Sequence, residues 1–163
     1  MTFHSAIKGF TTIELLVVIT IVGILASEAI PSMRSLLLNQ RIKSASMDVY
    51  AGLSYARSEA VARGLTGTVT MVPNVSTDWS QGWKVNFSTV TLKTADAISG
   101  LIITGPASIT YRNDGRITAG QQTFLLKPNP NPGAIPFRCV ITSPSGQPVM
   151  REDKNSDGNC SNG

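Results

Sequence analysis

Few side chains in this sequence of 163 residues are of the types that carry out chemistry. The only histidine is His4, in a short basic segment that precedes a long apolar stretch. Pairs of a nucleophile with a histidine, and zinc sites that use histidine, are therefore not expected in the rest of the chain. No Walker glycine loop or dinucleotide fingerprint occurs, and the carboxylates are scattered. We expect no enzymatic activity and no cofactor.

One run near the C-terminus has the spacing of a cation-binding loop. Asp153, Asn155, Asp157 and Gly158 form the pattern D-x-N-x-D-G, the first half of a calcium loop. The bidentate glutamate at the twelfth position of such a loop would fall beyond Gly163. The spacing alone therefore favours a solvated turn without a metal. Calcium is not expected to raise the melting temperature.

A carboxylate also stands in the first turn of a long apolar segment. From Phe10 to Pro31 the chain is almost entirely Leu, Ile, Val and Ala. As a helix it would be about 30 Å long, enough to cross a hydrocarbon core. Glu14 and Glu28 are the exceptions, and a carboxylate at mid-bilayer costs roughly 2.5–3.5 kcal/mol. Glu28 can reach water at the far end, whereas Glu14 either reaches the interface or has a specific partner.

The segment before this stretch differs from a secretory signal, whose apolar core precedes the cleavage site and is removed. Here residues 1–9 have no apolar core, and the core follows Gly9. Cleavage after Gly9 would leave Phe10 with a cationic amine one helical turn from Glu14. In a polymer, Glu14 would meet the amine of a neighbour, and the cost of a buried unpaired charge would favour one register between subunits.

These residues resemble the class III signal of type IV pilins and type II secretion pseudopilins. That motif is a glycine, then phenylalanine, with glutamate five residues into the mature chain, and here it is Gly9, Phe10 and Glu14. Thr12 and Glu28 stand where an apolar residue is more usual. The resemblance implies that a prepilin peptidase cleaves between Gly9 and Phe10 and methylates the new amine.

The helical pattern resumes after Pro31. Pro31 predicts a kink, because proline cannot donate to the helix ladder, and the family places a proline here. Arg63 and Gly64 predict the end of the helix. Apolar residues spaced by three or four positions form one face, namely Leu38, Ile42, Ala45, Val49, Leu53, Ala56 and Ala60.

The last turns of this helix, residues 53–64, resemble the end of the long helix in minor pilins of the FimU/FimT/GspH family. Arg57, Glu59 and Arg63 are read as charges on the helix surface. Glu59 and Arg63 are four residues apart and are expected to pair, at about 0.3–0.5 kcal/mol.

Beyond Gly64 the apolar period changes to that of strands. Residues 72–81 are expected to form a polar loop, Asn113–Gly115 a tight hairpin turn, and Pro128–Pro136 an extended segment rather than a central strand. Short strands are expected over residues 66–72, 83–88, 101–104, 108–112, 123–127 and 137–142. The predicted class is α+β, a pilin fold in which a long kinked N-terminal helix packs on an antiparallel β domain. Its parts are a leader (1–9), a transmembrane or filament-core helix (10–31), an amphipathic helix half (32–64) and a β-rich domain (65–163).

Cys139 and Cys160 are the only cysteines. In the exported part of a membrane-anchored protein they most simply form one disulfide, with two buried free thiols as the alternative. The balance of Lys and Arg around the span does not by itself place the C-terminus outside. The cysteines and the resemblance together predict a single-pass protein of the bacterial inner membrane with its C-terminus in the periplasm.

The resemblance implies a minor pilin that helps to initiate a type IV pilus at its tip, with roles in twitching motility and adhesion. Its partners would be the prepilin peptidase, other minor pilins, the major pilin and the inner membrane. A GspH-like pseudopilin of a type II secretion system is an alternative, because both machines use the same anchor chemistry.

A DNA-binding competence pilin of the FimT type is a further alternative. Such pilins use a Gly-Arg-x-Arg motif on a C-terminal loop, and here Gly146 is followed by Gln147, Pro148 and Val149. A neutral amide cannot supply the phosphate attraction that dominates DNA binding, so DNA is not the favoured partner. Cations elsewhere would have to share one face, and the candidates are Arg112, Arg116, Lys127 and Arg138.

Overall fold

The computed structural model describes residues 9–64, 67–131, 133 and 135–160, and residues 1–8 of the predicted leader lie outside this part. The chain forms two compact units, one ending at Leu36 and one beginning at Leu37. A single helix, α1 (Thr12–Arg63), contributes to both units. The predicted α+β class is confirmed, because the other elements are antiparallel strands.

The ends of α1 follow from its sequence. The helix begins at Thr12 and ends at Arg63, as the basic last turn and the following glycine predicted. Gly64 has φ +63°, the left-handed conformation that closes helices and that glycine adopts without strain. The backbone remains helical through Pro31, and the kink there stays a prediction.

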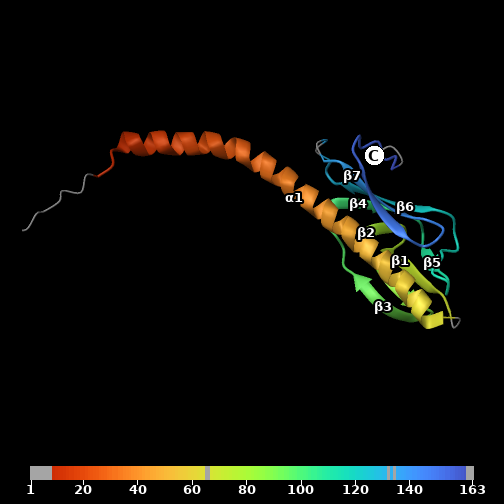
Figure 1. Cartoon of the computed structure of the whole chain (residues 1–163). Coiled ribbons are helices and arrows are strands. Elements are labelled where there is room, and N and C mark those ends of the chain that lie inside the picture. Colours follow the sequence, from red (N-terminus) through yellow and green to blue (C-terminus); the bar gives the residue numbers. More distant parts are fainter. Residues whose placement is uncertain (1–8, 65–66, 132, 134, 161–163) are drawn as a thin grey trace, which may run out of the picture. The chain divides into compact units, whose positions relative to one another are not determined.

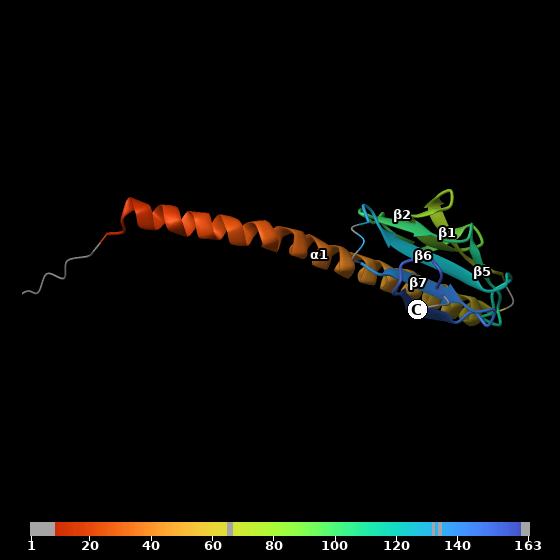
Figure 2. The ribbon, with the colours of Figure 1, turned by 90° about the horizontal axis from the view of Figure 1, so that it is seen from above.

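The second unit is built on the predicted apolar face of α1. Ile42, Val49 and Leu53 are fully buried in one core cluster with the sheet. Gly52 allows α1 to lie close to the sheet, because a Cβ there would overlap the ring of Trp83. Figure 2 shows this half of α1 lying along the strands. Burial of these side chains in a shared core orients the helix on the sheet.

The sheet has eight strands in the order β5-β1-β2-β4-β6-β7-β8, with β3 pairing to β2, and every pairing is antiparallel (Figure 1). The strands are β1 (Val69–Val75), β2 (Asp78–Phe87), β3 (Val90–Ala95), β4 (Leu101–Thr104), β5 (Ile109–Tyr111), β6 (Gln122–Pro128), β7 (Phe137–Thr142) and β8 (Pro148–Asp153). In the described residues, β2 and β4 pair at one position, where Asp78 lies opposite Thr104. The sheet therefore has two halves that meet at this point.

The junction of the two halves is buried and hydrogen-bonded. Trp79 stacks edge-on against Phe124, with ring centroids 4.7 Å apart, and its Nε1 donates to the carbonyl of Pro106 at 2.9 Å. The hydroxyl and N–H of Ser80 donate to Oδ1 of Asp78 at 2.5 and 2.9 Å. The Ser80 hydroxyl, and to a lesser extent its N–H, hold the pKa of Asp78 below its ordinary value, against the opposing effect of burial.

The prediction of a polar loop over residues 72–81 is wrong. β1 continues to Val75 and β2 begins at Asp78, so only a two-residue turn separates them. Polar side chains around Ser76 gave a loop-like composition, yet burial of Trp79 in the core extends β2 towards the turn. β3 and β8 were also missed, because each has one paired edge and few buried side chains.

The Asn113–Gly115 turn is confirmed. Gly115 has φ +76°, its N–H donates to the carbonyl of Arg112 at 2.9 Å, and the N–H of Arg112 donates to the carbonyl of Arg116 at 2.8 Å. Beyond the turn, Ile117 pairs with Tyr111 of β5 in an isolated bridge. The expected hairpin is thus a turn with one short second arm.

Candidate functional site

The start of α1 places Glu14 in a reciprocal cap with Thr11. The N–H and hydroxyl of Thr11 donate to Oε2 of Glu14 at 2.7 and 2.9 Å, and the N–H of Glu14 donates to Oγ1 of Thr11 at 3.3 Å. This is a capping box, which satisfies helix N–H groups that lack intrahelical partners. Sequence reasoning missed Thr11, although the T-x-x-E spacing before an apolar run is the signal for it. Glu14 therefore has a partner in its own chain.

The side chains that follow Glu14 form an apolar surface with no cover in the described structure. Phe10 is 93% exposed, and large apolar side chains on all sides of the helix from Ile13 to Leu25 are roughly half to two-thirds exposed. Among the described residues, α1 is the one helix long and apolar enough to cross a membrane, by length and composition. Such a surface is unfavourable in water and fits a lipid or helical environment.

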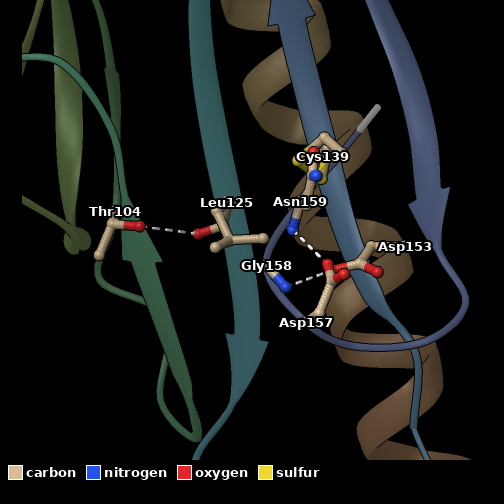
Figure 3. Close-up of a disulfide and its surroundings, with 8 residues drawn as sticks. Thr104, Leu125, Cys139, Asp153, Asp157, Gly158 and Asn159 are labelled. Carbon is tan, nitrogen blue, oxygen red and sulfur yellow. Dashed lines mark hydrogen bonds between the residues drawn. A yellow bond between two sulfur atoms is a disulfide. The ribbon is translucent and has the colours of Figure 1, made fainter. Parts of the chain in front are cut away.

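The predicted disulfide between Cys139 and Cys160 is present, with Cα atoms 5.9 Å apart and 21 residues of separation (Figure 3). Cys139 lies in β7 opposite Arg151 of β8. The bond therefore holds the segment after β8 against β7, and Cys160 is 7% exposed. The C-terminal loop is tied to the domain at both ends.

Within this loop the predicted calcium residues lie in one turn. Asp153 is the last residue of β8 and is fully buried, whereas the side chains of Asn155 and Asp157 are exposed. The N–H of Gly158 donates to Oδ2 of Asp153 at 2.8 Å, and the N–H of Asn159 donates to Oδ1 of Asp157 at 2.6 Å. The turn is thus organised around its two carboxylates.

The residues aligned with the DNA-binding motif form the turn between β7 and β8. The N–H of Gly146 donates to the carbonyl of Ser143 at 2.8 Å, and Gln147 is exposed. Gly146 has φ +81°, and a Cβ there would overlap the carbonyl oxygen of Gly115. The glycine is therefore needed for packing of two turns, and the exposed amide of Gln147 offers no charge to a phosphate.

The four candidate cations are divided between two ends of the domain. Arg112 and Arg116 flank the turn after β5, which contacts the β7–β8 turn. Lys127 and Arg138 lie near the other end of the β6–β7 pair, where β6 ends and β7 begins. This end is about 15 Å along the strands from the β7–β8 turn. Two of the four also form ion pairs with nearby carboxylates. This arrangement does not make one basic face.

Of the three charges near the end of α1, Arg57 connects elements. Its Nε donates to the carbonyl of Gly115 at 3.1 Å, so it ties the helix to the turn after β5. Tyr111 lies nearby in the core, where burial raises the pKa of its hydroxyl and the charge of Arg57 partly opposes this. Glu59 and Arg63 form the predicted pair at 2.8 Å. Arg57 is therefore more than the surface charge that its sequence suggested.

The architecture, an exposed apolar helical segment that continues into a helix packed on an antiparallel sheet, is that of a pilin. Two crystal structures of the type IV minor pilin FimU from Pseudomonas aeruginosa (strain PAO1) show the same fold. One matches with a TM-score of 0.58 at 21% identity over 72% of this chain and 96% of that chain. The other matches with a TM-score of 0.61 at 20% identity over 74% and 93%.

The model of the family described as "Type II transport protein GspH" matches residues 45–146, which is more than half of the chain. The matched region runs from the amphipathic half of α1 through the β7–β8 turn. The chain belongs to the GspH family. The predicted relation to the FimU/FimT/GspH group is confirmed by the family match and by the fold.

Proposed function

We propose that this protein is a minor pilin that primes assembly of a type IV pilus and stays at its tip. One observation carries the proposal: an uncovered apolar helical segment starts with a single carboxylate and is followed by a separate, well-packed domain. The first unit would lie in the inner membrane before assembly and among other pilin helices afterwards. Its work would be assembly rather than catalysis, and twitching motility and adhesion would depend on it through the filament.

Processing is the first step of this proposal. A prepilin peptidase would cut between Gly9 and Phe10 and methylate the amine of Phe10. Edman degradation or mass spectrometry of the protein from membranes should find Phe10 first, carrying one additional methyl group. Gly9→Val should leave an unshifted precursor on a gel, because a branched side chain cannot take the place of glycine at the cut. A mature chain that begins elsewhere would refute the proposal.

Glu14 would then exchange partners. In the free chain its carboxylate accepts hydrogen bonds from Thr11. In a filament, the amine of a neighbouring minor or major pilin would compete for the same carboxylate, away from water. A buried carboxylate without a cation is costly, so one register between subunits would be preferred.

A pseudopilin of a type II secretion system is the second candidate, and the description of the matched family favours it. The anchor chemistry is the same for both machines, so the discriminating measurement is the partner. Tagged protein cross-linked in the native host should recover type IV minor pilins, and a deletion should abolish twitching while secretion continues. Recovery of secretion pseudopilins, with loss of secretion, would replace the first candidate by the second.

A further inference from the structure

The side chain of Asp153 is the least satisfied polar group at the C-terminal loop. It is fully buried, and its Oδ1 has no hydrogen-bond partner among the described residues. A buried carboxylate oxygen without a donor is costly, so a cation is expected beside it. We propose that the loop from Asp153 to Asn159 binds one calcium ion, with Oδ1 of Asp153 as the central ligand.

The turn has the geometry that a D-x-N-x-D-G calcium loop requires. Gly158, at the sixth position, has φ +84° and turns the chain sharply, as the glycine of such loops does. Its N–H donates to Oδ2 of Asp153 at 2.8 Å, across five residues. This bond orients the carboxylate and occupies one oxygen, which leaves Oδ1 as the free ligand. The sequence pattern suggested none of this burial or orientation.

Two further side chains gather on the same turn. Figure 3 draws the side chains of Asp153 and Asp157 on the same turn, with the N–H groups of Gly158 and Asn159 bonded to them. Asp157 is held by the N–H of Asn159 at 2.6 Å and by Nδ2 of Asn155 at 2.9 Å. A divalent cation bound by both carboxylates would offset their two negative charges. Rotation of the Asn155 amide by half a turn would present its oxygen as a third ligand.

The ends of the loop are fixed before any ion arrives. Asp153 ends β8 and pairs with Phe137, and Cys160 is bonded to Cys139 of β7. The loop therefore loses little conformational freedom when an ion binds, which favours affinity. A small loop tethered in this way can bind an ion through few ligands, whereas an untethered segment would lose too much conformational entropy.

The ligand set is suited to calcium of modest affinity. In the described part of the chain, no three acidic, histidine or cysteine side chains converge, so hard oxygen ligands come from two carboxylates, one amide and main-chain carbonyls. Water would complete the six to eight ligands that calcium takes. Without the twelfth-position glutamate, a dissociation constant of about 0.1–1 mM is expected, as in extracellular calcium modules. Magnesium, which needs a nearly ideal octahedron, should bind less well.

Lys127 is the alternative to calcium as the positive charge that neutralises Asp153. Its Nζ lies over the ring of Phe137 at 5.4 Å from the centroid and 3.9 Å from where a Cβ of Gly158 would be. Among the residues described, no ion pair to Asp153 forms. A lysine that neutralised Asp153 would make calcium unnecessary, so the experiment has to separate these two possibilities.

The experiment is thermal unfolding of the full chain in detergent micelles, followed by near-UV circular dichroism. The wild type is compared in EDTA, in 10 mM calcium chloride and in 10 mM magnesium chloride. Calcium should raise Tm by about 3–10 °C and magnesium by less, given the expected affinity. Equilibrium dialysis with radioactive calcium should find one ion per chain. Absence of a calcium shift, or equal shifts with both metals, would overturn the proposal.

Variants locate the ion. Asp153→Asn and Asp157→Asn should each abolish most of the calcium shift, whereas Asp96→Asn, an exposed aspartate beyond β3, should keep it. If Asp153→Asn fails to fold, Asp157→Asn decides, because that side chain is exposed. Lys127→Gln should keep or enlarge the shift. A Lys127→Gln protein that is destabilised in EDTA and unresponsive to calcium would assign the counter-ion role to the lysine instead.

Discussion

Replacing Glu14 tests whether its charge or its cap matters for assembly. Glu14→Gln keeps an amide that can accept from Thr11, because glutamine also serves in capping boxes, but removes the charge. Glu14→Ala removes both, and Thr11→Ala removes the hydroxyl while the charge stays. The three variants therefore separate two roles that coincide in one side chain.

The magnitudes differ enough to be told apart. Loss of a helix cap costs about 0.5–2 kcal/mol of helix stability. Packing against neighbouring helices in a filament should offset most of this cost. Leaving one member of a buried ion pair alone costs about 3–5 kcal/mol. At 1.4 kcal/mol per factor of ten, Glu14→Gln and Glu14→Ala should both enter filaments at least about 100-fold less than wild type. Thr11→Ala should stay within a few-fold of wild type.

The assay compares the variant in sheared filaments with the total in membranes, by quantitative immunoblot. Cleavage of the leader is read on the same gels and should be normal in all three variants. If Glu14→Gln enters filaments as well as wild type while Glu14→Ala does not, the cap is what assembly needs. The register mechanism would then be wrong.

Three further predictions concern the stability of the β domain. Replacing Cys139 and Cys160 together by serine should lower the free energy of unfolding by about 3 kcal/mol, as expected for a loop closed across 21 residues. In calorimetry, Tm should fall by about 6–12 °C. A fall in Tm of less than about 2 °C would contradict this. Gly146→Ala should lower the free energy of unfolding in urea by about 2 kcal/mol or more, because it combines positive φ with a steric overlap. Gly133→Ala, with similar φ and open space, should lower it by about 1 kcal/mol. Equal costs would refute the role of the overlap. Asp78→Asn should be less stable than wild type at neutral pH. Because the folded pKa of Asp78 is depressed, that difference should persist down to about pH 4 and disappear as the pH falls further, and a difference independent of pH would rule out the ionised carboxylate as its source.

Local signals in the sequence were sufficient for α1. The spacing of Ile42, Val49 and Leu53 predicted the buried face, because a helix brings every third or fourth side chain to one side. Arg63 and Gly64 predicted its end through the conformation that glycine permits. β4 and β7 also match their predicted ranges, since buried strands are short apolar runs bounded by turn residues.

Two of the edge strands, β3 and β8, were not predictable in the same way. β3 and β8 carry exposed and charged side chains, and each pairs with the strand that precedes it in the chain, β2 or β7. Because this pairing uses backbone groups and buries few side chains, it leaves no apolar pattern in the sequence. The start of β2 was missed for a related reason. Its polar residues resemble a loop, and only the packing of Trp79 against Phe124, distant in sequence, makes the segment a strand.

The sequence alone determined the apolar anchor, the carboxylate of Glu14 in its first turn and the two cysteines, because each depends on residue type and short-range spacing. The tertiary structure decided which side chains lose contact with water. It buried Asp153 with one oxygen unsatisfied, and it divided the basic residues between two ends of the sheet. Both outcomes follow from strand register and the disulfide, which join residues far apart in the chain, so no local pattern could have contained them.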